Sequence, residues 1–222
     1  MTQIDKGTIL YRDELVRKSI HLCSLSIPII YYFITKQLAL KILIPLTLFS
    51  VVMDLSRYFF PALGNIFYRV FGFLLREHER DSRKKNLNGA SYVLVSALVC
   101  VLIFPKVFVL TSFSVLIISD TCAALFGRKF GRHKFLSKSL EGTLAFFISA
   151  CVVVMLSPKV EGALMEYMIG FIAVAVGAIA ENLSYGWADD NLTIPLSTGL
   201  TMWFLYYLLL PGLSLAIPNV PV

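Results

Sequence analysis

The sequence predicts an all-α integral membrane protein, built as one domain over residues 1–222. Hydrophobic residues make up 57% of the chain and charged residues 15%, whereas a soluble domain has about 45–50% and about 25%. Mean hydropathy is +0.76, and the apolar residues come in blocks with no linker between them. With only four dispersed cysteines, these values exclude an ordinary soluble domain, a disordered chain and a disulfide-rich secreted scaffold.

Seven apolar stretches approach the roughly 20 residues that a membrane-spanning helix needs. They cover residues 20–35, 38–54, 90–104, 107–126, 140–157, 163–183 and 194–210. The first stretch is short and contains Pro28, and three acidic residues precede it without a later A-x-A cleavage pattern. We therefore expect it to be a retained span rather than a cleaved signal peptide.

The segment between the second and third stretches predicts a helix lying in the membrane surface. Eight apolar residues from Phe59 to Leu74 follow one stripe of a 3.6-residue period, and Arg57, Arg69 and Arg76 mark its polar side and ends. This pattern favours an amphipathic interfacial helix. An eighth, poorly formed span is the alternative.

The distribution of Lys and Arg predicts how the chain is oriented in the membrane. Sixteen of the 20 basic residues lie in the N-terminal tail, in residues 57–85 or in residues 128–138, which share one side of a seven-span arrangement. The opposite side keeps only Lys36, Lys41, Lys106 and Lys159. We therefore expect the N-terminus and the basic segments at the cytoplasmic face, and the C-terminus outside.

Acidic residues near the spans gather on the same side as the basic ones. Those at or near the inner ends are Asp54, Asp120, Glu141, Glu181, Asp189 and Asp190. Only Glu161 and Glu166 fall on the outer side. A charge at mid-depth costs at least about 2.5–3.5 kcal/mol, so it usually has a function. Carboxylates that hold Mg²⁺ beside arginines that hold phosphate suit a phosphorylated, metal-bound ligand, and simple pairing of acids with bases is the alternative.

Residues 119–142 carry the most informative local order. Asp120 begins a face of small residues at helical spacing that ends in Gly127 and Gly131. The basic residues of this segment are Arg128, Lys129, Arg132, Lys134 and Lys138. Glycine lets backbone N–H groups approach an anion, and a helix beginning near Ser139 would point its positive end at the same place. We expect a phosphate-binding segment here, whereas the GxxxG core alone is more often a helix-packing motif.

A second candidate group is Glu181 together with Asp189, Asp190 and Asn191. The small residues that precede Glu181 on one stripe of the same span are Gly170, Ala173 and Gly177. This stripe predicts close helix packing that carries Glu181 to the inner interface. The D-D-N triplet could form a turn and helix cap, but its place beside the phosphate-binding segment favours metal or nucleotide contact.

A third candidate group lies before the first apolar stretch. Glu14, Arg17, Lys18 and His21 stand at offsets 0, 3, 4 and 7, which places all four on one helical face. Such a set is more often an interfacial anchor than a site. Asn88, at the inner start of the third stretch, is a weaker candidate that fits a helix cap and turn.

Together these motifs resemble the polyprenol kinase family, which includes dolichol kinases, phytol kinases and CTP-dependent diacylglycerol kinases. The matching motifs are D-x-x-A-x-x-x-G-R-x-F-G from Asp120, K-S-x-E-G from Lys138, E-x-x-R-K-x-x-H from Glu14 and D-D-N-x-x-x-P from Asp189. The resemblance covers roughly residues 10–200. The central motif also resembles that of phosphatidate cytidylyltransferases, but their C-terminal K-D-x-G…H-G-G…D-R segment does not occur in this sequence, which favours a kinase. The resemblance implies CTP as the phosphoryl donor and Mg²⁺ as the cofactor.

For such a kinase we expect Asp120 and Asp190, with Asp189, to bind Mg²⁺. Either Glu141 or Glu181 would orient or deprotonate the lipid hydroxyl. Phosphate or nucleotide contact is expected from Gly127, Arg128, Gly131, Arg132, Lys134, Lys138, Ser139 and Asn191, with Arg17, Lys18, His21 and Asn88 as further candidates. The expected partners are the lipid bilayer, a lipid alcohol and CTP, with no nucleic acid.

The sequence leaves the acceptor and two other functions open. Diacylglycerol, a polyprenol such as dolichol, and phytol each present a hydroxyl and an apolar tail. A phosphatidate cytidylyltransferase is the alternative enzyme, because it would use the same triphosphate site. A non-enzymatic transporter fits less well, since it predicts acids near the bilayer midplane and internal repeats.

Overall fold

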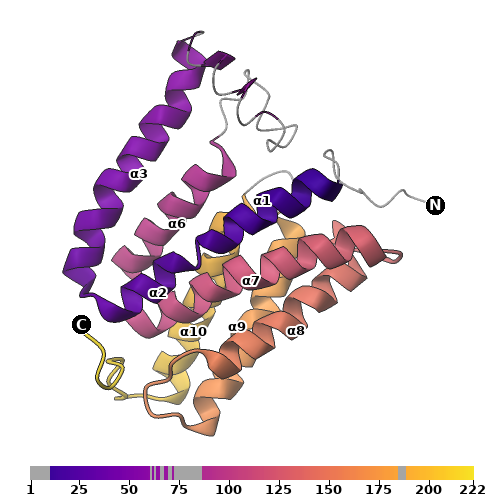
Figure 1. The fold of residues 1–222 in the computed structure, drawn as a ribbon. Coiled ribbons are helices and arrows are strands. Elements are labelled where there is room, and N and C mark those ends of the chain that lie inside the picture. Colours follow the sequence, from indigo (N-terminus) through magenta and orange to yellow (C-terminus); the bar gives the residue numbers. More distant parts are fainter. Residues whose placement is uncertain are drawn as a thin grey trace.

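The computed structural model describes residues 11–60, 62, 64, 65, 68, 69, 72, 87–184 and 189–222. These residues fold mainly into helices, in agreement with the all-α prediction (Figure 1). The helices are α1 (Tyr11–Cys23), α2 (Ser26–Phe33), α3 (Lys36–Phe59), α6 (Gly89–Ile103), α7 (Lys106–Phe130), α8 (Leu140–Leu156), α9 (Leu164–Leu183) and α10 (Asp190–Leu209). The interfacial helix expected over residues 59–76 falls mostly outside the described residues and stays a prediction.

Within the described residues, four helices are long and apolar enough to cross a membrane, namely α3, α7, α9 and α10. Helices α6 and α8 are apolar but have only 15 and 17 residues, at or below the short end of the usual range. These six helices coincide with six of the predicted spans. The count of seven is not confirmed, because the first predicted span is not one helix.

The stretch over residues 20–35 is divided between α1 and α2. Pro28 explains the division, because it has no N–H to donate and its ring clashes with the carbonyl four residues earlier, which belongs to Ser24. At the break the Ser24 N–H donates to His21 O at 2.9 Å, a tighter turn than that of an α-helix. Helix α1 begins at Tyr11, before the predicted stretch, and it contains the whole third candidate group.

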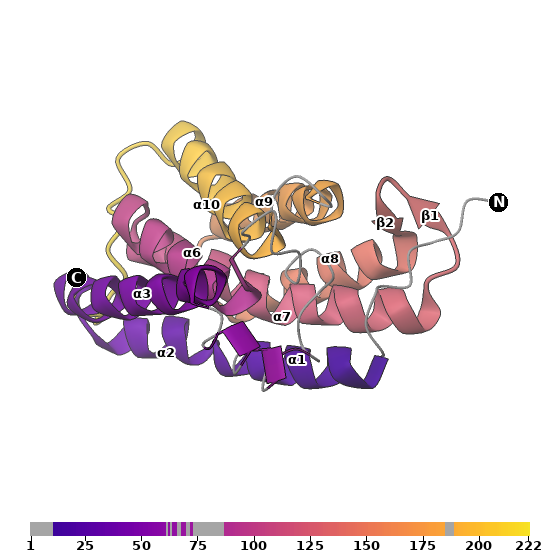
Figure 2. The same cartoon turned by 90° about the horizontal axis from the view of Figure 1, so that it is seen from above.

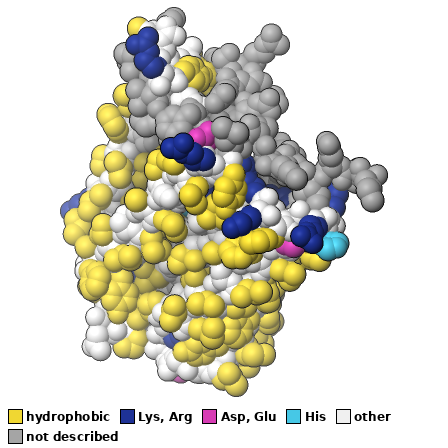
Figure 3. Space-filling model, turned by 45° about the vertical axis from the view of Figure 1, so that its right-hand side comes forward, with side chains coloured by type: hydrophobic (Ala, Val, Ile, Leu, Met, Phe, Trp, Pro, Cys, Tyr) yellow, Lys and Arg dark blue, Asp and Glu magenta, His cyan; other side chains and the backbone are white. Residues whose placement is uncertain are grey.

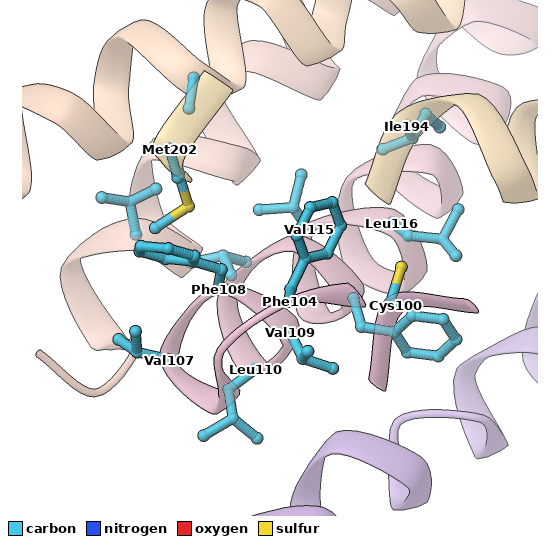
Figure 4. Packing of buried hydrophobic residues seen from close by; sticks show 14 of the residues in the cluster. Cys100, Phe104, Val107, Phe108, Val109, Leu110, Val115, Leu116, Ile194 and Met202 are labelled. Atoms are coloured by element: carbon cyan, nitrogen blue, oxygen red, sulfur yellow. The ribbon is translucent and has the colours of Figure 1, made fainter. Parts of the chain in front are cut away.

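Helix α7 lies at the centre of the bundle. In an apolar 18-residue stretch of each helix, 78% of the residues of α7 are buried, against 22% of those of α3. Helices α1, α2, α8 and α10 all pack against α7 (Figure 2). Phe108 of α7 packs edge to face on Tyr206 of α10, with ring centroids 4.9 Å apart, and Phe104 and Met202 complete this part of the core (Figure 4). A polar side chain on α7 is therefore buried among other helices, whereas α3 leaves most of its apolar surface for lipid.

Glycines bring the central helices close together. A Cβ at Gly177 of α9 would lie 2.5 Å from Thr198 Oγ1 of α10, and a Cβ at Gly170 would lie 2.5 Å from Val154 Cγ1 of α8. Both distances are too short for a real side chain. The close packing predicted from the small-residue stripe on α9 is thus confirmed.

A short hairpin interrupts the helices between α7 and α8. Strands β1 (Lys134–Phe135) and β2 (Lys138–Ser139) pair antiparallel, and Leu136 in the turn between them has a positive φ of 50°. The sequence analysis did not predict this hairpin, because two-residue strands leave no periodic pattern to read. The hairpin places Lys138 directly before α8.

The two ends of the bundle differ in what they contain. One end contains the C-termini of α7 and α9, the N-terminus of α10 and the β1–β2 hairpin, and we call it the polar end. We call the closing end the one formed by the α2–α3, α6–α7 and α8–α9 connections and by residues 210–222. On the face shown in Figure 3, charged side chains lie mainly in the upper part and hydrophobic side chains cover the lower part. This distribution fits an apolar body held in a membrane with its charges at one edge.

Candidate functional site

A buried ion pair joins α1 to α7 at the polar end. Lys18 Nζ lies 2.5 Å from Asp120 Oδ2, and His21 Nε2 lies 3.7 Å from the same oxygen. Lys18 is 1% exposed and Asp120 is 3% exposed. A charge that is buried this deeply requires a partner. The α1 face predicted from the offsets 0, 3, 4 and 7 is therefore directed at α7 rather than at the membrane surface.

A second buried ion pair joins the hairpin to α9 and α10. Lys138 Nζ makes a short contact with Glu181 Oε1 and lies 3.8 Å from Asp190 Oδ2. Burial alone would lower the pKa of the Lys138 ammonium, but the surrounding carboxylates, chiefly that of Glu181, raise it above its usual value. Asp120 also acts electrostatically on Lys138, so the two ion pairs belong to one group.

We call Lys18, His21, Asp120, Lys138, Glu181 and Asp190 the charged cluster. Within these six side chains, three carboxylates face two ammonium groups, which leaves one negative charge in excess when His21 is neutral. Two buried atoms of the cluster, His21 Nε2 and Glu181 Oε2, make no hydrogen bond. Buried polar atoms are nearly always satisfied in native proteins. The cluster therefore has the charge and the open positions to take a further ligand.

A second layer of charges lies behind the cluster on α1. Arg17 NH2 lies 2.6 Å from Glu14 Oε1, and Arg128 NH2 lies 3.4 Å from Glu14 Oε2. Burial opposes ionisation of Glu14, but hydrogen bonds from Arg17 and the neighbouring positive charges lower its pKa to about 2. Glu14 thus holds two guanidinium groups near the cluster. The sequence analysis placed Glu14 in the third candidate group but expected no binding or catalytic role for it.

Asn182 holds the hairpin in place. Its side-chain Oδ1 accepts from the backbone N–H of Ser137 at 2.8 Å and from that of Lys138 at 3.2 Å, and its Nδ2 donates to Thr143 Oγ1 at 2.7 Å. Asn182 is fully buried. The sequence analysis gave it no role, although a polar residue directly after Glu181 in an apolar helix was the available signal. Asn182 positions Lys138 against Glu181.

Gly127 and Gly131 of α7 face the beginning of α8. A Cβ at Gly127 would lie 3.1 Å from Ser139 Oγ and 3.3 Å from Gly142 Cα. Ser139 caps α8, as its Oγ accepts from the Gly142 N–H at 3.2 Å. The predicted helix start is confirmed, and the glycines let α7 and α8 approach. A phosphate-binding role for Gly127, Gly131 and Ser139 stays a prediction.

Other residues of the hairpin region lie away from the charged cluster. Both carboxylate oxygens of Glu141 accept from the His133 N–H, at 3.2 and 3.3 Å, and His133 Nδ1 lies 2.7 Å from Oε1. Arg132 and Lys134 are exposed. These three candidates therefore lie nearer the solvent than the buried charged cluster.

The remaining candidates lie at helix starts. Asp189 caps α10, because its Oδ1 accepts from the Asn191 backbone N–H at 2.9 Å and from Asn191 Nδ2 at 2.7 Å. Asn88 caps α6 by accepting from the Ser91 N–H at 2.9 Å, and its own N–H donates to Asp54 Oδ2 at 2.6 Å. The D-D-N segment thus forms a cap and also delivers Asp190 to the cluster, and its contact with a metal or nucleotide stays a prediction. For the Asn88 side chain, the structure shows only the capping role.

The cluster can be tested for a fit to a divalent metal. Among residues 11–60, 87–184 and 189–222, no three Asp, Glu, His or Cys side chains are arranged to hold a metal ion. Mg²⁺ at nucleotide sites, however, takes only one or two carboxylates, and substrate phosphates supply further oxygens. Asp120 and Asp190 offer such carboxylates. The donor set fits Mg²⁺ that arrives with a nucleotide.

Comparison with known proteins gives several relatives. The chain is 30% identical to uncharacterized protein RP860 of Rickettsia prowazekii over 88% of this chain and 96% of the relative. It is 27% identical to CTP-dependent diacylglycerol kinase 1 of Schizosaccharomyces pombe over 68% of this chain and 74% of the relative. It is 33% identical to phytol kinase of Synechocystis sp. over 40% of each chain. No family model matches the chain, and no solved structure matches it either.

Proposed function

Because the chain belongs to the polyprenol kinase family of membrane lipid kinases, we propose that it transfers the γ-phosphoryl group of CTP to the hydroxyl of a lipid alcohol. The observation that carries this proposal is the charged cluster, where Lys18 pairs with Asp120 and Lys138 pairs with Glu181. Phosphoryl transfer depends mainly on positioning and on neutralising charge. A cluster of ammonium and carboxylate groups at the end of apolar helices supports both.

The basic side chains around the cluster are proposed to bind the triphosphate. Lys18 and Lys138 supply ammonium groups inside the cluster, and Arg17 and Arg128 lie beside it on Glu14. A guanidinium group matches phosphate oxygens with two parallel hydrogen bonds. Arg132 and Lys134, which are exposed on the hairpin, would attract the nucleotide from solution.

Asp120 and Asp190 are proposed to hold Mg²⁺ together with the phosphates. The metal, when bound, supplies neutralisation of the charge that develops on the phosphate oxygens. The buried position of both carboxylates supports this role, because it keeps them oriented toward Lys18 and Lys138. Asp189 shapes this place from the cap of α10.

Glu181 is the better candidate for the base of the two that the sequence left open. Its Oε2 has no hydrogen-bond partner, whereas both oxygens of Glu141 accept from His133. In the proposed step, Glu181 Oε2 accepts the proton of the lipid hydroxyl. The alcohol oxygen bonds to the γ-phosphorus, the bond from that phosphorus to the β–γ bridging oxygen breaks, and CDP leaves.

The acceptor is proposed to be a lipid alcohol that reaches the polar end from the bilayer. Diacylglycerol and phytol are the acceptors that the names of the relatives indicate, and a polyprenol has the same chemistry. From the Lys and Arg distribution, we infer that this end faces the cytoplasm.

A panel of lipid alcohols incubated with the purified protein and labelled nucleotide tests the proposal. We expect label from the γ-phosphate of CTP to move to one alcohol in the presence of Mg²⁺, and chelation of the metal to stop the transfer. The same transfer from ATP would contradict the assignment of CTP. Appearance of cytidine in a lipid product made from phosphatidate would instead establish a cytidylyltransferase. Failure of every alcohol with both nucleotides would remove the kinase proposal.

A further inference from the structure

A separate cavity lies at the closing end, away from the charged cluster. It has a volume of about 260 Å³, and its wall includes Tyr31 of α2, the first residues of α3 and α7, and part of the C-terminal segment. Helix α7 is 25 residues long, or about 37 Å, and it separates this cavity from the polar end. The proposed kinase function makes no use of this cavity.

Two lysine side chains line the cavity. Lys36 and Lys106 belong to its wall, and none of the described residues that line it is Asp or Glu. Lys36 begins α3 and Lys106 begins α7, so the positive ends of two long helices lie at the same place. The N-cap of α7 is Pro105, which makes no side-chain hydrogen bond to the helix. Both the lysines and the helix ends favour an anion.

A buried hydroxyl gives an independent indication of a ligand. Tyr31 is 2% exposed, and its hydroxyl makes no hydrogen bond. Lys106 Nζ lies 4.8 Å from the centre of the Tyr31 ring, so the phenol and the ammonium are neighbours. A buried hydroxyl without a partner costs free energy, and a small shift of the Tyr31 side chain that opens its hydroxyl to the cavity would let an anion there accept its proton.

The lysines also have a structural role, which does not use all their donors. Lys36 Nζ donates to Leu102 O at 3.1 Å. Lys106 Nζ donates to Ile34 O at 2.7 Å and to Pro221 O. Each ammonium has three N–H groups. After these hydrogen bonds to backbone carbonyls, Lys36 and Lys106 therefore each keep at least one free N–H donor.

We propose that this cavity binds the phosphate of an anionic lipid headgroup. Phe104 and Ile217 give its wall an apolar part beside the two ammonium groups, which suits an amphiphile better than a free ion. The cavity is smaller than the range of about 300–1,000 Å³ that is usual for ligand pockets, so it accommodates a headgroup while the acyl chains stay in the bilayer. The bound lipid would stabilise the closing end.

The test reconstitutes the full chain in phosphatidylcholine, with and without phosphatidylglycerol, and measures the unfolding temperature and the lipid retained in native mass spectrometry. We expect phosphatidylglycerol to raise the unfolding temperature, since a ligand that binds only the folded state stabilises it. Tyr31→Phe removes only an oxygen that has no partner, so it should preserve the fold and weaken retention about three- to tenfold. Lys36→Gln should weaken it similarly.

Lys159→Gln is the matched control. Lys159 lies at the same end and donates to Val154 O and Ser157 O, but it does not line the cavity. The control should retain phosphatidylglycerol as the unmodified chain does. Equal retention by Tyr31→Phe and the unmodified chain would overturn the proposal. Equal stabilisation by inorganic phosphate in phosphatidylcholine would overturn the lipid source and assign the site to a free anion.

Discussion

The two ends of the helical bundle use charged residues in opposite ways. At the polar end, Lys18 and Lys138 pair with carboxylates from other helices, and two buried atoms of the charged cluster keep open positions. At the closing end, Glu166 accepts from four consecutive backbone N–H groups, from Val160 to Ala163, at 2.7–3.2 Å. It also accepts from the Tyr206 hydroxyl at 2.9 Å.

This difference separates charges that serve the fold from charges that are available for chemistry. A carboxylate that accepts five hydrogen bonds has no capacity for a substrate, and its loss leaves donors unsatisfied. A carboxylate paired with an ammonium can exchange that partner for a metal or for a proton. Glu166 and Glu181 are both buried carboxylates, so the type of partner is what distinguishes them.

Replacement of Asp120 by Asn should have the largest effect on activity. The change removes the carboxylate proposed for the metal and leaves the Lys18 ammonium buried without its counter-ion. We expect kinase activity to fall by about 100-fold or more, as for other electrostatic groups at reacting phosphates. The measurement is the rate of label transfer from CTP to lipid, divided by the amount of folded protein.

Two variants make this result interpretable. Breaking a buried ion pair costs about 3–5 kcal/mol, so Asp120→Asn combined with Lys18→Met should recover stability without recovering activity. Glu161→Gln changes an exposed carboxylate near Glu166 and should leave the rate unchanged. Wild-type activity in well-expressed Asp120→Asn protein would remove the metal role.

Replacement of Glu166 by Ala tests the other side of the comparison. Four backbone N–H groups and the Tyr206 hydroxyl would lose their acceptor, so we expect the free energy of unfolding to fall by about 3 kcal/mol or more. Thermal unfolding in detergent measures this loss. The turnover of the protein that remains folded should not change, and a selective loss of turnover would show that the two ends are coupled.

Hydropathy and periodicity predicted most of the fold because they depend on local sequence. Six apolar stretches became helices at the expected positions, and the cap at Ser139 begins α8 as predicted. The first stretch is divided between α1 and α2 near Pro28, a break that hydropathy averaging does not reveal, so its prediction as one span is not confirmed. The β1–β2 hairpin is too short to leave a pattern.

The charged cluster was predicted only as separate pieces. Spacing placed Lys18 on a helical face and Asp120 at the inner part of a span, but 102 residues separate these two partners. Periodicity defines which face a residue occupies, not which helix lies opposite that face. For the same reason the sequence analysis could not choose between Glu141 and Glu181, whose difference lies in the partners of their oxygens.

Replacement of Asn182 by Ala should have an intermediate effect, because this residue acts through Lys138. Loss of its Oδ1 frees the backbone at Ser137 and Lys138 and loosens the contact with Glu181. We expect kcat/KM to fall about tenfold, in line with one or two buried hydrogen bonds. Asn182→Asp keeps both acceptor contacts but loses the donation to Thr143 and buries a charge, so it should restore part of the activity. A purely structural role would lower stability in both variants without this rescue.

Replacement of Asn88 by Ala should have the smallest effect, and it decides whether this residue belongs to the site. Its side chain caps α6 by accepting from the Ser91 N–H, and loss of such a cap costs about 1 kcal/mol. The backbone N–H that donates to Asp54 is retained. Thermal unfolding should show this loss in Asn88→Ala and its recovery in Asn88→Ser, which can cap the helix in the same way. If kinase activity falls further than stability and Asn88→Ser does not restore it, the side chain contacts a substrate at the polar end.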